Sequence, residues 1–318
     1  MLDASTVKRL AVDTGFDLVG ITTPEVITDA RERYYVWLEH EYHGEMDYLA
    51  KEPDRRCDPS RILPDVKSVI MLGLNYYQPN APTTPDQHGR ISRYARGRDY
   101  HKVIASRVKQ LVRSLESRDD LPDFAQFRWF VDFGPFLERP YAEKAGLGFI
   151  GKNGMLINKR FGSWIFLSEI LTTLELEPDK RDPFSHGHCA TCRLCMDACP
   201  TGAIVHPRTI DSRRCISYLT IERPSTIPDF LADKMGDLMF GCDICQEVCP
   251  YNQDPIRTTH ADFLPPNGVG EFLDTRKVLA LESREEFLKL TAGTPLTRPK
   301  EEGLKRNAEI VKRNGGTK

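Results

Sequence analysis

No run of about 18 consecutive apolar residues, the length that spans a bilayer, occurs in this sequence. The N-terminal stretch also lacks the basic-then-apolar order of a secretion signal, because Asp3, Lys8 and Asp17 are mixed with its apolar residues. These absences predict a cytoplasmic protein with no membrane partner.

Neither sign of charge dominates the chain. Its 318 residues carry 44 Lys+Arg and 46 Asp+Glu, a formal net charge of -2, so the whole molecule has no strong attraction for nucleic acid. Residues 291–318, however, hold 7 Lys+Arg against 3 Glu, a net +4. We expect this segment to be either an RNA-binding tail or a solvated charged helix.

Cysteine is almost missing outside one part of the chain. Only Cys57 precedes residue 189, and the other eight of the nine cysteines lie between residues 189 and 249. Cytoplasmic cysteines stay reduced, so a cluster of them indicates metal ligands rather than disulfides. Cys57 is left over, and we expect it to be a packed thiol.

The clustered cysteines form two related runs. The first is C-x2-C-x2-C-x3-C-P over residues 189–200, the bacterial ferredoxin run, whose fourth cysteine ligates a second cluster. The second run, over residues 242–250, has Met239 where its first cysteine would fall, and Cys215 is the one spare cysteine nearby. We therefore predict two 4Fe–4S clusters with crossed ligation, one held by Cys189, Cys192, Cys195 and Cys249, the other by Cys199, Cys215, Cys242 and Cys245. Two zinc sites are the alternative, which the ferredoxin spacing disfavours.

The apolar patterns predict alternating helices and strands. A helix followed by a strand at 16–21 begins the chain, and strands follow at 66–74, 127–133 and 163–176. Helical spacing of apolar residues occurs over 103–115, 136–145 and 283–290, while 80–89 is rich in proline and polar residues and predicts a loop. We predict an α+β protein with parts 1–178, 179–260 and 261–318, the first an α/β layer domain and the last partly helical.

A glycine-rich stretch, residues 146–153, spells G-x-G-x-x-G and nearly spells a phosphate-binding loop. Both motifs should follow a strand, whereas a helical pattern precedes these glycines, and Asn153 replaces the required Ser or Thr. Two interpretations remain. Gly146 ends a helix in the left-handed conformation, or the bare glycine backbone, with Lys152 and Asn153, packs against a large cofactor or substrate.

Several stretches together resemble epoxyqueuosine reductases. They are residues 92–94 (SRY), 99–101 (DYH), 131–135 (VDFGP), 138–139 (ER), 144–153 (KAGLGFIGKN) and 241–252 (GCDICQEVCPYN). The resemblance covers nearly the whole chain. It implies reduction of an epoxide on a modified tRNA base to an alkene, with loss of water.

The resemblance also implies cofactors, partners and site residues. It implies a cobalamin beside the two clusters, a nitroreductase-like cobalamin-binding domain over 1–178 and a ferredoxin-like module over 179–260. A queuosine-family tRNA and an external low-potential electron donor are the implied partners, and we expect a monomer. Asp132 matches the family's proton donor. The implied cofactor contacts are Tyr94, Asp132, Lys152, Asn153 and Leu156.

Some features depart from the pattern or leave alternatives open. The cobalamin signature D-x-H-x-x-G is broken by Ile104, so we expect His101 to be a helix-start histidine without a cofactor role. Asp132 could be a turn residue only, but Val131 and Phe133 suggest apolar burial, which would raise its pKa and keep it protonated. No C-terminal helical-repeat domain is expected. A corrinoid reductive dehalogenase and a plain ferredoxin-type electron carrier are the alternative functions.

Overall fold

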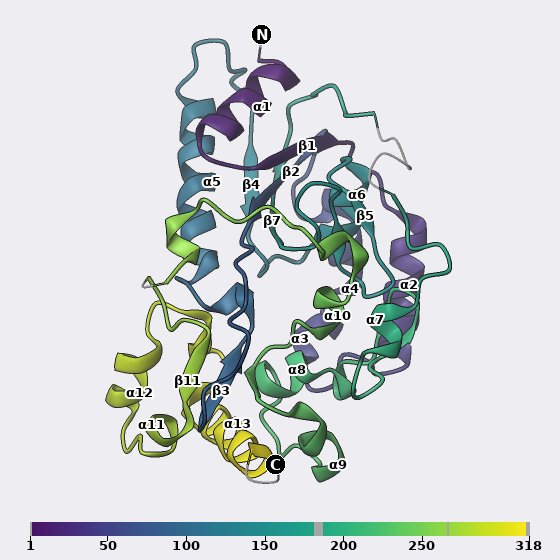
Figure 1. The fold of residues 1–318 in the computed structure, drawn as a ribbon. Coiled ribbons are helices and arrows are strands. Elements are labelled where there is room, and N and C mark those ends of the chain that lie inside the picture. The colour runs from purple at the N-terminus through teal and green to yellow at the C-terminus, as the bar shows by residue number, and fades with distance from the viewer. Residues whose placement is uncertain (1, 181–186, 266, 316–318) are drawn as a thin grey trace.

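The computed structural model describes residues 2–180, 187–265 and 267–315. Figure 1 shows the chain beginning at one end of the molecule and finishing at the other. Within the described ranges, no helix is both long and apolar enough to span a membrane.

The elements are as follows. The strands are β1 Leu18–Thr22, β2 Ser68–Asn75, β3 His88–Ile91, β4 Phe127–Phe130, β5 Phe149–Ile150, β6 Leu156–Ile157, β7 Ile165–Thr172, β8 Ile204–His206, β9 Thr209–Ile210, β10 Leu238–Phe240 and β11 Phe272–Asp274. The helices are α1 Ala4–Asp13, α2 Thr28–Glu39, α3 Asp47–Ala50, α4 Pro53–Cys57, α5 Tyr100–Glu116, α6 Glu138–Lys144, α7 Leu194–Asp197, α8 Ile216–Ile221, α9 Asp229–Ala232, α10 Ile244–Glu247, α11 Thr275–Leu279, α12 Arg284–Thr291 and α13 Lys300–Gly315.

A four-stranded antiparallel sheet forms the centre of the N-terminal part. Its strand order is β1-β2-β7-β4. Every residue of β2 is buried, because helices cover both faces of the sheet. The predicted strands at 16–21, 66–74, 127–133 and 163–176 are confirmed with shifted ends, and so is the mixed α/β character.

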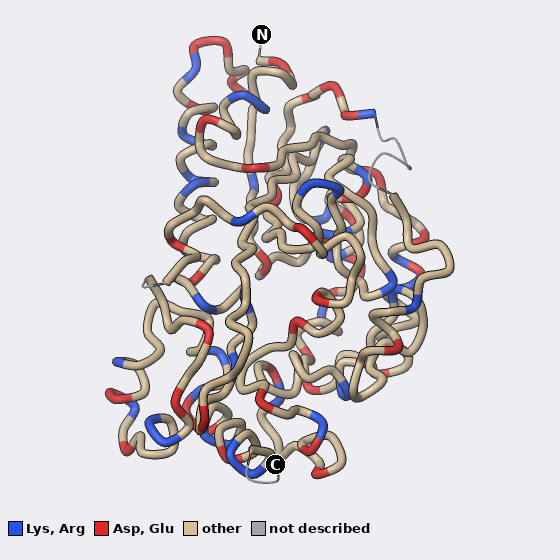
Figure 2. The backbone as a smooth tube through the Cα atoms, viewed as in Figure 1, with Lys and Arg blue, Asp and Glu red and all other residues tan. Residues whose placement is uncertain are grey.

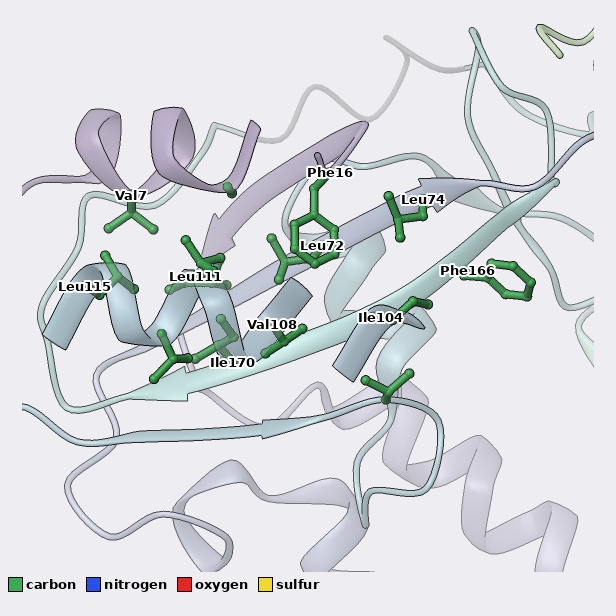
Figure 3. Close-up of a cluster of buried hydrophobic side chains, with 14 of the residues drawn as sticks. Val7, Phe16, Leu72, Leu74, Ile104, Val108, Leu111, Leu115, Phe166 and Ile170 are labelled. Atoms are coloured by element: carbon green, nitrogen blue, oxygen red, sulfur yellow. The ribbon is translucent and has the colours of Figure 1, made fainter. Parts of the chain in front are cut away.

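Helices α1 and α5 pack on one face of this sheet, as Figure 3 shows. The apolar spacing predicts a helix over 103–115, and α5 confirms it. The apolar face of α5, which includes Val108, Leu111 and Leu115, is buried against Leu72 and Ile170. On the other face, α6 packs its Tyr141 and Ala142 into a second apolar cluster. The sheet therefore fixes where α5 begins and where α6 begins, the two places that form the candidate site.

A second sheet joins segments far apart in the sequence. Strand β3 lies between β10, to which it is parallel, and β11, to which it is antiparallel. The predicted loop over 80–89 is therefore wrong at its end, where His88 and Gly89 belong to β3. Local sequence could not show this, since a four-residue strand gains its stability from partners distant in the chain.

The glycine-rich stretch is a helix end followed by a short hairpin. Gly146 has φ +78° and its N–H donates to the Glu143 carbonyl, which confirms the left-handed helix end. Strands β5 and β6 then pair. A Cβ on Gly148 would lie 2.3 Å from the Ile157 carbonyl oxygen, so this position requires glycine. The short hairpin of β5 and β6 takes the place of the helix that a phosphate-binding loop requires, so this stretch is not such a loop.

Cys57 is 2% exposed, and burial raises the pKa of its thiol to about 11. The predicted packed thiol is thus confirmed.

The basic C-terminal segment is mostly the helix α13, and its charges are used inside the protein. The Arg306 guanidinium donates to the carbonyls of Leu219 (2.8 Å), Arg223 (2.8 Å) and Ser225 (2.6 Å). Lys305 binds the Leu281 carbonyl and the Glu301 carboxylate. Figure 2 shows basic and acidic residues interleaved at this end of the chain. Lys305 and Arg306 therefore stabilise the fold through internal contacts. Whether the segment also binds RNA stays a prediction.

Replacing Arg306 by Ala should destabilise the protein by about 2–3 kcal/mol, because it leaves three backbone carbonyls without their charged donor. Lys312→Ala, on an exposed position of the same helix, is the control and should change stability by less than about 0.5 kcal/mol. Chemical unfolding measures both. Equal effects of the two substitutions would contradict the structural role of Arg306.

Candidate active site and cluster site

The two cysteine runs come together although about 50 residues separate them. Short helices α7 and α10, one from each run, lie against each other. Cys189 and Cys249 pack with Phe149 and Ile157, while Cys215 and Cys242 pack in a different apolar cluster. The structure thus separates the cysteines into two groups.

Electrostatic neighbours define the same groups. Burial raises the pKa of Cys195, and the charges of Cys189, Cys249 and Cys192 raise it further. Burial also raises the pKa of Cys245 well above its ordinary value, with Cys242 and Cys215 as the next causes. For Cys242 the charges of Cys215 and Cys199 add to the effect of burial. The charges that act on Cys195 and Cys242 come from cysteines assigned to the same cluster, whereas the charge of Cys195 also acts on Cys245 across the two groups. The two ligand sets stay a prediction.

Backbone N–H groups point at the cysteine sulfurs. Lys152 N donates to Cys189 Sγ at 3.4 Å, and Ala203 N donates to Cys199 Sγ at 3.2 Å. Hydrogen bonds to sulfur are one of the means by which proteins set cluster potentials. Among the described residues, which include all eight cysteines, no three His, Cys, Asp or Glu side chains converge on a single-ion site.

Three of the predicted cofactor contacts lie beside the cysteine loops or in the core. Lys152 Nζ donates to the carbonyls of Ala190 (2.7 Å) and Cys192 (2.8 Å), and Asn153 Nδ2 donates to the Cys245 carbonyl at 3.3 Å. Leu156 is 3% exposed and packs under α6. The polar groups of Lys152 and Asn153 therefore bind the cysteine loops, and the Leu156 side chain is enclosed in the core.

A buried ion pair connects the cysteine loops to the N-terminal part. Arg93 Nη1 lies 3.1 Å from Asp243 Oδ2 and 2.8 Å from Glu247 Oε1, and its guanidinium stacks on Trp164 at 4.5 Å. Burial raises the pKa of Asp243, while the Arg93 guanidinium opposes that shift. Next to this pair, Gly241 approaches Tyr94 so closely that its Cβ would lie 3.3 Å from the tyrosine ring. The second cysteine group therefore adjoins Tyr94.

Asp132 lies on a tight turn just after β4. It has φ +62°, uncommon for a residue other than glycine, and the Phe133 N–H donates to the Val131 carbonyl across it. The Asp132 N–H donates to Glu138 Oε1 at 2.8 Å. Asp132 is therefore a turn residue, as one interpretation held, and the strained turn holds its carboxylate in a defined place.

The Asp132 carboxylate accepts two hydrogen bonds from the start of α5. Tyr100 Oη donates to Oδ2, and His101 Nε2 lies 3.2 Å from the same oxygen. Desolvation is the largest influence on its pKa and raises it, but the bonds from His101 and Tyr100 outweigh this effect, so the pKa is lowered overall. The expectation of a protonated Asp132 is therefore wrong. Its carboxyl is 53% exposed and ionised at neutral pH.

His101 lies beside Asp132, a placement that the sequence analysis did not predict. Asp99 caps α5 by accepting from the His101 N–H, and its Oδ1 lies 2.8 Å from His101 Nδ1. Desolvation lowers the pKa of His101, but its bonds to Asp132 and Asp99 prevail and raise it to about 9. The imidazole is thus protonated at neutral pH between two carboxylates. His101 lies at the start of α5, as the sequence predicts. The sequence feature that points to its ion pair is Asp99, two residues earlier in the DYH stretch.

Aromatic rings surround this carboxylate. Phe133 is 68% exposed and stacks on His101, with ring centroids 4.2 Å apart. Tyr94 packs edge-on against Tyr100 at 6.0 Å, and the charge of Asp132 helps, after burial, to raise the pKa of Tyr94 well above its ordinary value. Phe133 thus covers His101, while Tyr94 packs against Tyr100, the other residue that binds the Asp132 carboxylate.

Two electron-carrying groups next to a carboxylate backed by a proton donor are the parts of a reductase, an oxidoreductase that adds electrons and protons to a substrate. A family profile described as 4Fe-4S double cluster binding domain matches residues 188–252. Another, described as Epoxyqueuosine reductase QueG, DUF1730, matches residues 56–133.

Relatives in other organisms extend the match to most of the chain. Epoxyqueuosine reductase of Escherichia coli (strain K12) is 41% identical over 301 residues, which are 93% of this chain and 76% of that protein. That of Synechocystis sp. is 43% identical over 284 residues, 88% of this chain and 94% of that protein. The chain belongs to the epoxyqueuosine reductase family.

Solved structures share its fold. An epoxyqueuosine reductase crystallised with an epoxyqueuosine-modified tRNA-Tyr stem loop superposes with a TM-score of 0.89 at 29% identity, covering 98% of this chain and 81% of that one. The Bacillus subtilis enzyme with its aspartate catalytic loop swung out of the active site gives 0.87 at 28% identity, covering 98% and 81%.

The His101 imidazole should keep its proton up to about pH 9. In Asp132→Asn the carboxylate that stabilises the imidazolium is gone, so the pKa should fall toward the ordinary value of 6.5. NMR titration of ¹⁵N-histidine-labelled protein measures both, with His101→Gln to assign the signal. An identical titration in wild type and Asp132→Asn would refute the pairing.

Proposed function

We propose that this protein reduces epoxyqueuosine in tRNA to queuosine with electrons from two 4Fe–4S clusters. The observation that carries the proposal is the Asp132 carboxylate, held on a strained turn and hydrogen-bonded by Tyr100 and His101, in a chain of this family. Opening the epoxide to an alkene and water consumes two electrons and two protons. The site supplies both, because it combines cysteine groups for clusters with an acid near the substrate.

The electron route follows the positions of the cysteine groups. Cys189, Cys192, Cys195 and Cys249 would hold the first cluster, and Cys199, Cys215, Cys242 and Cys245 the second. The second group adjoins Tyr94 through Gly241, and the charge of Asp132 acts on Tyr94. Electrons from an external low-potential donor would therefore enter at the first cluster and leave from the second toward the Asp132 turn.

Cobalamin is the cofactor proposed between the second cluster and the substrate. When bound, it would supply a cobalt centre that accepts single electrons and reacts as a two-electron nucleophile. The residues fit such a group in two respects. The rings of Tyr94 and Phe133 offer apolar faces, and the Ser92 hydroxyl next to Tyr94 is buried without a hydrogen-bond partner in the described residues. Tyr94 and Asp132 would contact the group through side chains, and Lys152, Asn153 and Leu156 through the backbone.

The proton for the departing oxygen originates on His101 in this proposal. Asp132 is ionised at rest and has no proton to donate. As the epoxide C–O bond breaks and the oxygen gains basicity, the His101 imidazolium passes its proton to Asp132 Oδ2, 3.2 Å away, and Asp132 delivers that proton to the oxygen, which leaves His101 neutral. Asp99 then stabilises His101 in the correct orientation through Nδ1.

The finer architecture is also part of the proposal. Residues 1–178 would form the nitroreductase-like cobalamin-binding domain, 179–260 the ferredoxin-like module and 261–318 a helical segment, in a monomer.

The tRNA would bind mainly outside α13, because Lys305 and Arg306 of this helix make internal contacts. Its modified base would lie at the exposed side of the Asp132 carboxylate. The cytoplasm is the proposed location.

Asp132→Asn should lower turnover of epoxyqueuosine tRNA by about 10²–10⁴-fold, the usual contribution of a general acid. The amide can keep the turn but cannot carry the proton. Anaerobic reconstitution with iron, sulfide and cobalamin precedes the assay, and iron and corrin content must match wild type. Asp123→Asn, an exposed position, is the control and should be fully active. A near-wild-type rate in Asp132→Asn would return Asp132 to a purely structural role.

Cys215→Ala should lose the second cluster alone and retain about half of the iron, since each cluster holds four irons. Cys57→Ala is the matched control, because Cys57 belongs to neither group, and it should retain all the iron. Iron analysis and electron paramagnetic resonance of the reduced protein distinguish the two variants. Full iron content in Cys215→Ala would overturn the assignment of this ligand.

A further inference from the structure

Two glutamates lie behind the Asp132 turn, and the proton route described above does not use them. Glu169 is on β7 and is 0% exposed, opposite Phe130 and Met71 in the register of the sheet. Glu138 begins α6, and its Oε1 accepts the Asp132 N–H at 2.8 Å. A fully buried glutamate in the middle of an apolar sheet is costly, so its protonation state needs an explanation.

The surroundings of Glu169 provide that explanation. Within the described residues neither of its carboxyl oxygens has a hydrogen-bond donor. Its polar neighbour is the carboxyl of Glu138, and two ionised carboxylates cannot hydrogen-bond each other. Helix α6, which Glu138 begins, packs against β7, which carries Glu169, so a proton on one carboxyl would let it donate to the other. The contact therefore requires at least one proton on the pair.

Charges around the pair act in the same direction. Burial raises the pKa of Glu138 to about 7, and the charge of Asp132 adds to this effect. The pKa of Glu138 is lowered, to a smaller extent, by the Asp132 N–H, the Arg139 guanidinium and the interaction with Glu169. Burial, the charge of Glu138, the interaction with its carboxyl and the charge of Asp132 raise the pKa of Glu169 well above its ordinary value. Glu169 thus stays protonated, while Glu138 exchanges its proton near neutral pH.

We propose that Glu138 and Glu169 form a proton store that supplies the Asp132 turn with the second proton of the reaction. This inference rests on the proposed function, in which two protons are consumed and His101 accounts for one. The second proton leaves the Glu138 carboxyl, passes to the Asp132 carboxylate and then to the departing oxygen, completing water. Glu169 keeps its own proton and donates a hydrogen bond to the Glu138 carboxylate that remains. Solvent returns a proton to Glu138 between turnovers, and the two electrons arrive through the clusters.

A purely positional role for Glu138 is the competing explanation, because Glu138 anchors the turn through the Asp132 N–H. Glu138→Gln separates the two roles. The glutamine carbonyl can accept the same N–H, so the turn is kept, but the amide has no exchangeable acid proton. Glu169→Gln is the complementary variant, since its amide can donate to Glu138 and so stabilise the ionised form of Glu138.

Glu143→Gln is the matched control. Glu143 is a buried glutamate on the same helix, and its Oε1 accepts the Ile150 N–H at 3.0 Å, just as Glu138 accepts the Asp132 N–H. Its hydrogen bond to Ile150 lies outside the Asp132 turn. This variant reproduces the chemical change of Glu138→Gln without removing the proposed store.

The experiment combines turnover with infrared spectroscopy of the reconstituted protein. Glu138→Gln should lower turnover by about 10²-fold at pH 7.5, the lower end for a general acid, with unchanged KM for tRNA and unchanged iron. Glu169→Gln should have a low turnover rate at pH 7.5 that rises as the pH falls, because the pKa of Glu138 is lower in this variant. Glu143→Gln should match wild type.

In the infrared, wild type should show carbonyl stretching of protonated carboxyl groups at pH 7.5. Part of this absorption should disappear in each of Glu138→Gln and Glu169→Gln, and none in Glu143→Gln. A wild-type rate and pH profile in Glu138→Gln would overturn the proton store and leave the proposed function standing. Failure of wild type to reduce epoxyqueuosine tRNA would instead reject the proposed function. In that case, a wild-type spectrum without absorption from protonated carboxyl groups at pH 7.5 would reject the proton store as well. If this absorption is present and decreases in Glu138→Gln and Glu169→Gln, it would support the proton store even though the substrate is different.

Discussion

The contact on which the site depends is the buried ion pair between Arg93 and Asp243. Arg93 precedes Tyr94, and Asp243 lies between Cys242 and Cys245, so one pair of side chains fixes the distance between the second cysteine group and the ring next to Asp132. Removing one partner of such a pair costs about 3–5 kcal/mol, because the other charge stays buried alone. The cluster loop and the N-terminal sheet are consequently held as one unit, and electrons do not have to cross a mobile joint.

In the proposed mechanism, the residue that stores the proton, His101, differs from the residue that delivers it, Asp132. A carboxyl kept protonated by apolar burial would have to be shielded from water, whereas Asp132 is 53% exposed and open to substrate. The proton is kept instead on the enclosed His101, between two carboxylates that stabilise the positive charge. Asp132 can thus be accessible to a bulky base and still draw on an acid of suitable strength.

The sequence allowed much of this structure to be predicted wherever the determinant was local. The 3.6-residue spacing of Val108, Leu111 and Leu115 identified α5 and its buried face, and the spacing of the cysteines predicted that the two runs would lie close together in the fold. Non-local effects were not predictable. The pKa of Asp132 depends on two donors from α5, about thirty residues earlier in the chain, rather than on its apolar neighbours in sequence. Strand β3 likewise had no local signal.

The placement of β3 has a consequence for the order in which the chain matures. Both of its neighbours, β10 and β11, are made long after it, and Arg93 meets Asp243 across 150 residues. During synthesis the N-terminal sheet can fold early, but both edges of β3 stay unpaired until residues 238–240 emerge, and one edge stays unpaired until residues 272–274 emerge. Unpaired strand edges are sites of aggregation. A chain released before β11 is made would therefore contain all eight clustered cysteines and yet expose one unpaired edge of β3, so the last stage of synthesis protects the protein from aggregation.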